Sequence, residues 1–216
     1  AEKIIENEGG IIFNKTVSAV DVNNDIIKTL KFSDGEEVEI STDDIIISSI
    51  PITIMSKFFG YDSNLKFRGV RLAYIAIKKE SVLPNDMNWL YYDSDKVLFN
   101  RVSEPKTMAP DIASNDKTVL VAEVTYSKGD AIDQLSDQDF LDKIIEDLEQ
   151  VSLVSKSDVY ASLSHKEDFV YPIQDKDYQQ ELVKTRSILN RFSQLYSLGT
   201  GGDFNYADSQ ILFHMA

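Results

Sequence analysis

Short apolar or alternating runs fill the first forty positions, a pattern typical of β-strands. They lie at residues 11–13, 17–22, 26–32 and 38–40. Asp34-Gly35 separates the last two runs and is a hairpin turn pair, so we expect these strands to form a β-meander. Residues 44–50 contain three consecutive isoleucines, whereas a half-exposed strand would alternate. We therefore expect a buried strand that ends at Pro51.

After Pro51 the pattern predicts a short helix and then a second group of strands. The helix covers residues 52–59, and the strands cover residues 67–78, 88–92, 97–102 and 118–126. Pro84, Pro105 and Pro110 fall between these strands, where proline is typical of loops.

A long helix is expected to begin after Ser136, because serine caps helix N-termini and an acid, Asp139, follows three residues later. Phe140, Ile144 and Leu148 then recur at the spacing of a single helix face, which predicts a face packed on a core. The remaining predicted elements are a strand at 159–164, a helix at 178–192 and a strand at 195–198.

The chain of 216 residues is acidic: 36 Asp and Glu against 22 Lys and Arg give a formal net charge of −14. Such a surface repels phosphate backbones and anionic lipids, so we expect no nucleic-acid partner. The absence of cysteine excludes disulfides and zinc–thiolate sites, and two histidines are too few for a histidine metal cluster. No apolar run reaches the roughly 18 residues of a membrane span, and we expect a cytoplasmic protein.

The sharpest local feature is Gly199-Thr200-Gly201-Gly202, directly after the last predicted strand. Three glycines in four positions let backbone N–H groups approach a ligand closely, and a helix beginning beyond them favours an anionic group. A plain turn that needs glycine for its conformation is the alternative. The chain contains neither a G-x-G-x-x-G nor a P-loop motif, so it is not expected to bind a dinucleotide by itself.

A second candidate site combines Trp89-Leu90-Tyr91-Tyr92 with Phe99-Asn100-Arg101-Val102. On two adjacent strands, Tyr91 or Tyr92 would share a face with Arg101. Arginine forks onto phosphate or carboxylate groups, and tyrosine stacks on bases or sugar rings. The alternative is an aromatic core beside a solvated arginine.

A third candidate is Tyr171, which precedes Pro172 and would either line a pocket or serve as a packing plug. No Ser-His-Asp arrangement and no paired-carboxylate spacing stands out in the sequence. The residues alone therefore indicate binding sites more readily than catalytic groups.

Taken together, the segments resemble the FAD-dependent amine oxidase superfamily, and within it the group related to UDP-galactopyranose mutase and protoporphyrinogen oxidase. The likeness follows the order of the chain over nearly its whole length. Thr200 stands where this group commonly has Arg or an acid, and Met108 stands where mutases carry Tyr. The stretches that carry the resemblance are Asn14–Val17, Asp44–Pro51, Trp89–Tyr92, Phe99–Val102, Met108–Pro110, Tyr171–Ile173 and Gly199–Tyr206.

The resemblance implies a role for each candidate residue. Val17 would contact the FAD adenine through its backbone, and the segment Gly199, Thr200, Gly201 and Gly202 would bind the FAD diphosphate and ribityl groups. Arg101 would face a substrate diphosphate. The residues expected to wall the substrate pocket are Tyr91, Tyr171 and Tyr206.

The glycine-rich Rossmann segment that opens such proteins is absent from this chain. Residues 1–10 end in Gly9-Gly10, a pattern typical of a helix end. We therefore expect a fragment that lacks the preceding nucleotide-binding half and is inactive alone.

The expected fold is α+β (mixed α/β). A partial FAD-binding domain would be formed by residues 1–51 and 193–216, and an antiparallel-sheet substrate domain by residues 52–192. The resemblance implies that the parent protein binds FAD and is an oxidoreductase or flavin-dependent mutase, with a nucleotide sugar as the candidate small-molecule substrate. Two alternatives stay open: an amine-oxidase or desaturase-like enzyme with an apolar substrate, and a binding module without chemistry. The catalytic residues and the oligomeric state stay undefined at this stage.

Overall fold

The computed structural model describes residues 10–84, 87–208 and 210–211, and the chain divides into two compact units. The terminal unit combines Ala1–Lys66 with Pro172–Ala216, and the central unit is Phe67–Tyr171. This division differs from the expected one, because residues 52–66 and 172–192 belong to the terminal unit and not to the central one. The helix expected in residues 1–9 lies outside the described residues.

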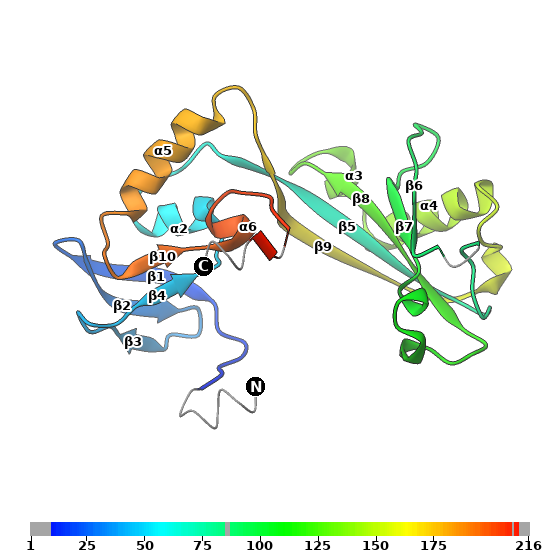
Figure 1. The fold of residues 1–216 in the computed structure, drawn as a ribbon, viewed down its shortest axis with the longest axis horizontal. Helices are drawn as coiled ribbons and strands as arrows, with labels where there is room; N and C mark the ends of the chain where they lie inside the picture. Colours follow the sequence, from blue (N-terminus) through cyan, green and yellow to red (C-terminus); the bar gives the residue numbers. More distant parts are fainter. Residues whose placement is uncertain (1–9, 85–86, 209, 212–216) are drawn as a thin grey trace. The chain divides into compact units, whose positions relative to one another are not determined.

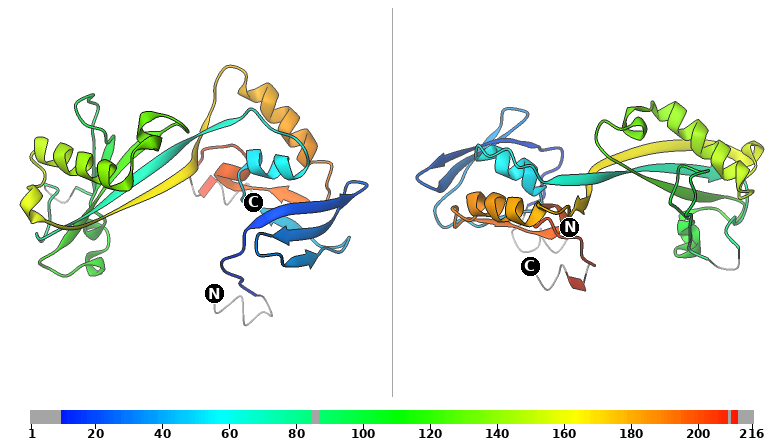
Figure 2. Two further views of the ribbon diagram at one scale, coloured as in Figure 1. Left: turned by 180° about the vertical axis from the view of Figure 1, so that it is seen from behind. Right: turned by 90° about the horizontal axis from the view of Figure 1, so that it is seen from above.

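Two helices account for this difference in the boundaries. Helix α2 (Ile52–Phe58) packs against α5 (Tyr178–Leu189), against the short helix α6 (Gly199–Gly202) and against β1 (Val17–Asn23), as the views in Figures 1 and 2 illustrate. On α5, Glu181 accepts hydrogen bonds from the Tyr61 hydroxyl and from the Asn64 N–H, both at 2.9 Å. These bonds hold the loop after α2 against α5. Both helices therefore belong to the core of the terminal unit.

The predicted β-meander is present in the terminal unit. Strand β1 pairs with β2 (Ile26–Phe32), which pairs with β3 (Glu37–Glu39), all antiparallel. The first hairpin turns at Asn24-Asp25, where φ is 48° and 60°, a left-handed conformation in which these two residue types are enriched. The strand expected at residues 11–13 is wrong: these residues are irregular, and Ile12 and Phe13 are exposed, because no neighbouring strand pairs with them in the described chain.

A separate two-stranded parallel sheet joins β4 (Ile46–Ser48) to β10 (Leu195–Ser197). The Ile46 N–H donates to the Gln194 carbonyl at 2.7 Å, and the Leu198 N–H donates to the Ser48 carbonyl at 2.8 Å. This pairing brings residues 195–198 beside residues 46–48, about 150 positions earlier in the chain. The expectation that the strand at 44–50 is buried is wrong in part, because Ile45 and Ile47 are 68% and 71% exposed.

The buried side chain of Gln194 connects this sheet to the meander. Its amide oxygen accepts a hydrogen bond from the Ile27 N–H at 2.9 Å, and its amide nitrogen donates to the Ser41 carbonyl at 2.7 Å. Both bonds satisfy backbone groups that water does not reach, and such groups are costly when unpaired. Gln194 thus ties the two sheets of the terminal unit together.

The central unit is a five-stranded sheet in the order β6-β7-β8-β5-β9. The pairs β5–β8, β6–β7 and β7–β8 are antiparallel, as the sequence predicts. Residues 97–100, expected to belong to a strand, instead form a loop that leads into β7. The strands are β5 (Lys66–Ile77), β6 (Trp89–Tyr91), β7 (Arg101–Ser103), β8 (Thr118–Tyr126) and β9 (Val159–Ile173), and the helices are α3 (Ala131–Gln134), α4 (Asp137–Gln150), η1 (Pro105–Thr107), η2 (Pro110–Ile112) and η3 (Lys156–Asp158).

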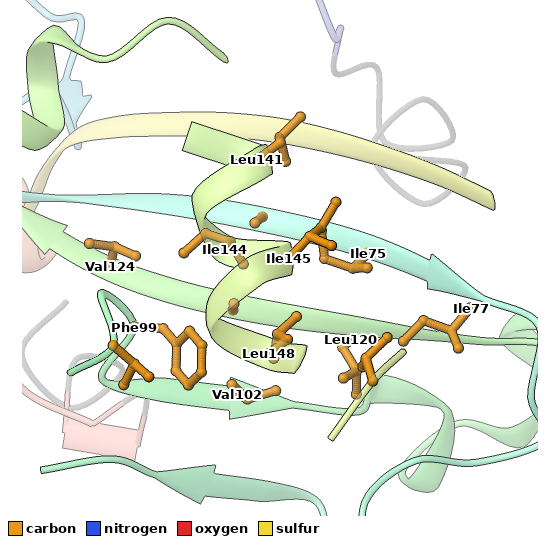
Figure 3. Close-up of a cluster of buried hydrophobic side chains, with 14 of the residues drawn as sticks. Ile75, Ile77, Phe99, Val102, Leu120, Val124, Leu141, Ile144, Ile145 and Leu148 are labelled. Atoms are coloured by element: carbon orange, nitrogen blue, oxygen red, sulfur yellow. The ribbon is translucent and has the colours of Figure 1, made fainter. Parts of the chain in front are cut away.

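Helix α4 covers one face of this sheet and provides its core. The Ser136 hydroxyl accepts a hydrogen bond from the Asp139 N–H at 3.1 Å, which confirms the predicted cap. Figure 3 shows Ile144 and Leu148 of α4 among the aliphatic side chains of β5, β7 and β8. Each such buried side chain contributes about 1.5–3 kcal/mol. Within the described residues, no helix is both long enough and apolar enough to cross a bilayer.

A buried arginine, Arg71 of β5, connects the sheet to the start of α4. Its guanidinium donates to the carbonyls of Ile132 and Leu135 at 2.9 and 3.0 Å and to the Asp137 carboxylate at 2.7 Å. Its carbon centre also lies 4.3 Å from the centre of the Phe140 ring. Only 1% of its surface is exposed, and its hydrogen bonds hold the two carbonyls at the start of α4.

Replacing this arginine should destabilise the protein. Arg71→Ala removes the donors for two carbonyls, and each buried polar group left unpaired costs about 1–3 kcal/mol. We expect a total loss of about 3 kcal/mol, to which Asp137 adds little, because 75% of its side chain is exposed. Urea unfolding measures this loss. Arg68→Ala, at an exposed position of the same strand, should change stability by less than about 0.5 kcal/mol, and an equal loss in both variants would contradict the assignment.

Candidate functional site

The glycine segment forms a single helical turn, α6, after β10. Gly199 has φ +78°, a conformation that L side chains rarely adopt and that glycine allows at little cost. A Cβ atom on Gly202 would lie 2.9 Å from the Ser197 hydroxyl oxygen and 3.1 Å from the Ser48 carbonyl oxygen. Glycine is therefore required here, because α6 packs directly on the protein's own backbone.

This turn lies at the carboxyl ends of the two parallel strands. Position 201 contacts the ends of the strands as well, since a Cβ on Gly201 would lie 3.4 Å from the Ser49 carbonyl oxygen. Val17 of β1 borders a groove that Ser48 and Ser49 also line. The glycine turn thus packs on the end of β4, and Val17, far from it in sequence, lines a groove that includes the same two serines. Ligands of open α/β sheets bind at this edge of a parallel sheet.

An ion pair holds the residues that follow α6. Arg186 of α5 donates to the Asp203 carbonyl at 2.9 Å and also to its carboxylate. Tyr206, two residues beyond the buried Phe204, is exposed. A cavity of about 470 Å³ opens between α5, β10 and α6, and Arg186, Asp203 and Gly202 are among its lining residues.

The central unit brings Tyr91 and Arg101 together on the uncovered face of its sheet. Tyr91 of β6 lies opposite Arg101 of β7, and Arg101 lies opposite Glu123 of β8. The Tyr91 hydroxyl accepts a hydrogen bond from Arg101 Nη1 at 3.4 Å. The expected pairing is therefore present with Tyr91, whereas Tyr92 packs edge-on against Phe99 at 4.9 Å between ring centres.

Glu123 compensates the charge of Arg101. Arg101 Nε and Nη2 each donate to one Glu123 carboxylate oxygen at 2.7 Å, a bidentate geometry that is among the strongest ion-pair arrangements. Burial by itself would lower the pKa of Arg101, but its hydrogen bonds to Glu123 and Tyr91 outweigh that effect and raise the pKa. An anion at this place would have to share the guanidinium with Glu123.

Aromatic and aliphatic side chains surround this ion pair. Across the next row of the sheet, Trp89 lies opposite Ser103, which lies opposite Val121. Trp89 and Tyr91 are 47% and 68% exposed, so both rings are accessible for stacking. Tyr171, the third candidate, is half-buried on β9, the edge strand at the opposite side of the sheet from β6.

Sequence reasoning missed three buried or half-buried polar residues. Gln194 and Arg71 connect elements that are distant in the chain, so no local pattern marks them. Glu123 could have been found from the sequence, because it is the one acid within the apolar strand Thr118–Tyr126. A carboxylate in such a strand needs a hydrogen-bonding or charged partner.

No group of three or more His, Asp or Glu side chains in the part of the chain that the structure describes could hold a metal ion. The described histidine, His165, is exposed on β9.

Of the comparisons with known proteins, the one with solved structures gives matches. No protein-family profile matches the chain, and no curated protein sequence is significantly similar to it. A reduced UDP-galactopyranose mutase matches 93% of this chain and 43% of its own, with a TM-score of 0.75 and 22% identity. A protoporphyrinogen oxidase-like protein from Exiguobacterium sp. 255-15 matches 93% of this chain and 46% of its own, with a TM-score of 0.64 and 17% identity. The glycerol-3-phosphate dehydrogenase from Bacillus halodurans, solved in complex with FAD, matches 82% of this chain and 34% of its own, with a TM-score of 0.52 and 10% identity.

These matches confirm the resemblance at the level of the fold. The mutase and the oxidase-like protein belong to the FAD-dependent amine oxidase superfamily, and the chain has the α+β fold of the matching part of these flavoenzymes. It spans less than half the length of each of the three proteins.

The close packing of α6 yields a test of the glycine turn. Gly202→Ala should force α6 away from the ends of β4 and β10, and overpacking of this kind costs about 1–3 kcal/mol. Urea unfolding should show that loss. Gly10→Ala, where an added Cβ meets nothing within 4 Å, should be nearly neutral, and equal stability of the two variants would contradict the packing argument.

Proposed function

We propose that the chain is the substrate-binding part of an FAD-dependent oxidoreductase or flavin-dependent mutase. Its terminal unit supplies one border of the flavin site, and its central unit supplies a surface for the substrate. The flavin, once bound, carries out the redox or group-transfer chemistry, and this chain's residues bind and orient the reactants.

The observation that carries the proposal is the packing of the glycine turn on the end of β4, beside a groove that Val17 lines. Gly201 lies against the Ser49 carbonyl, and Val17 and Ser49 line the same groove, at the edge of a parallel sheet where nucleotide cofactors bind. The fold match to a UDP-galactopyranose mutase over 93% of the chain supports the same reading. In this proposal Val17, Gly199, Thr200, Gly201 and Gly202 contact FAD.

On the substrate side, the proposal assigns binding first to two residues of the central unit. Arg101 holds an anionic group of the substrate, and Tyr91 stacks on a ring beside it, as a nucleotide sugar requires. The exposed Trp89 extends this stacking surface. Tyr171 and Tyr206 are proposed as further residues of the substrate site.

The bidentate ion pair favours a second candidate, a flavoenzyme of the amine-oxidase type with an apolar substrate. Glu123 neutralises Arg101 through two hydrogen bonds of 2.7 Å. A surface of Trp89, Tyr91 and neutralised Arg101 suits an uncharged molecule, because no unpaired charge has to be desolvated there. The two candidates differ in the effect that neutralising Glu123 has on the binding of a nucleotide sugar.

Flavin binding tests the proposal directly. The 216 residues alone should bind FAD more weakly than micromolar, because they provide only one border of its site. Joined to a polypeptide that supplies the other border of the site, they should carry a flavin that is visible in the absorption spectrum. A colourless protein from the joined chain, or micromolar FAD binding by the 216 residues, would contradict this division of the site.

The substrate assignment is tested by two substitutions in the ion pair. Trp89 is the single tryptophan of the chain, so its fluorescence reports binding of UDP-galactose beside Tyr91. Arg101→Ala should weaken this binding by about 10-fold, since a hydrogen bond to a charged group contributes about 1.5–3 kcal/mol. Glu123→Gln should instead strengthen it, because Arg101 then has its whole charge for the phosphates.

Arg191→Ala is the matched control. Arg191 is an exposed arginine of the terminal unit, where it pairs with Asp25. The substitution should leave the titration unchanged. If Glu123→Gln and Arg101→Ala also leave it unchanged, the nucleotide-sugar assignment fails and the apolar candidate is favoured.

A further inference from the structure

A lysine ammonium group lies among four backbone carbonyls in the central unit. Lys106, in η1, donates hydrogen bonds to the carbonyls of Ser114 and Lys117, both at 2.8 Å. It also donates to the carbonyls of Glu80 at 3.0 Å and of Asn115 at 3.3 Å. An ammonium group has three N–H donors, so these four acceptors, here called the carbonyl ring, saturate it.

The carbonyl ring is built from two loops that are distant in sequence. Glu80 follows β5, whereas the other three members precede β8. Rings of backbone carbonyls replace the hydration shell of K⁺ in selective binding sites, and ammonium is similar to K⁺ in size and charge. The net charge of −14 adds a general attraction for cations. The ring therefore has the chemistry of a monovalent-cation site.

A buried carboxylate holds the same two loops with the opposite charge. Glu104, two residues before Lys106, is fully buried. Its carboxylate accepts hydrogen bonds from the Val82 and Leu83 N–H groups at 3.1 and 2.8 Å and from the Thr118 hydroxyl at 2.6 Å. One short segment thus presents an anion to the donors and a cation to the carbonyls of these loops. Hydrogen bonds to charged groups are stronger than neutral ones, so the segment fixes both loops.

The same segment also fixes the start of β6. The Glu104 N–H donates to the Asn88 carbonyl at 3.0 Å, and the Thr107 hydroxyl donates to the Asn88 side-chain oxygen at 2.8 Å. Asn88 directly precedes Trp89, whose ring is 47% exposed. The place of this half-exposed ring therefore depends on the hydrogen bonds of its neighbour.

We infer that Lys106 fills a monovalent-cation site of this fold and, as a positioning residue, sets the place of Trp89 on the sheet. The tethered ammonium takes the position that a K⁺ ion would otherwise hold, so the loops are fixed without a bound metal ion. A variant that lacks the ammonium but leaves its space open should bind K⁺ or free ammonium in the carbonyl ring. The alternative is that the aliphatic stem of Lys106 stabilises the turn by packing alone. The inference does not depend on flavin, so its tests and those of the proposed function fail separately.

Rescue by cations separates the charge of Lys106 from its stem. Urea unfolding of Lys106→Ala is compared in potassium, ammonium and tetramethylammonium chloride at equal concentration, since tetramethylammonium is too large for the carbonyl ring. The folding equilibrium constant should be about tenfold higher in the first two salts, as a ligand at about ten times its dissociation constant supplies. Lys106→Met fills the space with an apolar chain and should be destabilised without any rescue.

Lys79→Ala is the matched control, because Lys79 is another lysine of the central unit and pairs with Asp158 at 2.8 Å. This variant and the unmodified protein should each have the same stability in the three salts. If potassium does not rescue Lys106→Ala, the carbonyl ring is not a cation site and the inference is overturned. An equal response of Lys106→Met or Lys79→Ala to potassium would overturn it as well, because the effect would then be one of general salt.

Fluorescence of Trp89 tests the positioning role in the folded protein. Since the chain has a single tryptophan, quenching by acrylamide reports how accessible this ring is. In tetramethylammonium chloride the Lys106→Ala variant should be quenched on the order of twofold more strongly than the unmodified protein, because the start of β6 is loosened. Potassium chloride should restore the original value, and Lys79→Ala should match the unmodified protein in both salts. Quenching of Lys106→Ala that equals that of the unmodified protein in both salts would overturn the positioning role.

Discussion

The terminal unit depends on the parallel pairing of β4 with β10. Three residues on each strand form that ladder, and the buried amide of Gln194 extends it to the meander through a contact that spans 167 positions of sequence. Closing so long a loop costs conformational entropy, which the packing of α2 and α5 around the strands offsets. The glycine turn packs on the end of β4 because this pairing places β10 beside it.

The central unit is organised differently, around long antiparallel strands and buried polar contacts. Arg71 is satisfied by two carbonyls and a carboxylate. Glu104, also fully buried, accepts hydrogen bonds from the N–H groups of Val82 and Leu83 and from the Thr118 hydroxyl. These contacts fix the loops around a sheet whose uncovered face carries Tyr91, Arg101 and Glu123. A rigid support of this kind suits a binding surface, because it lowers the ordering cost of association.

The two candidate sites are constrained by different physical interactions. The glycine turn is constrained by close packing, since Gly202 has no room for a side chain, whereas the ion pair of Arg101 and Glu123 is constrained by charge balance. Flavoenzyme folds support many reactions on one scaffold. The fold match therefore identifies the scaffold alone.

The sequence by itself determined the elements whose periodicity is local. The meander, the capped helix after Ser136, the antiparallel strands and the glycine turn all follow from patterns within about ten residues, and the order of the motifs along the chain was enough to indicate the flavoenzyme fold. Only the tertiary structure decided which of these elements pack together. In the structure α2 and α5 belong to the terminal unit, although the sequence placed them in the substrate domain. Ile47 is exposed, although the run of isoleucines predicted a buried strand. The tertiary structure also gave Arg101 a partner in Glu123. Burial and ion pairing depend on residues brought together from distant positions, and hydrophobic periodicity carries no information about them.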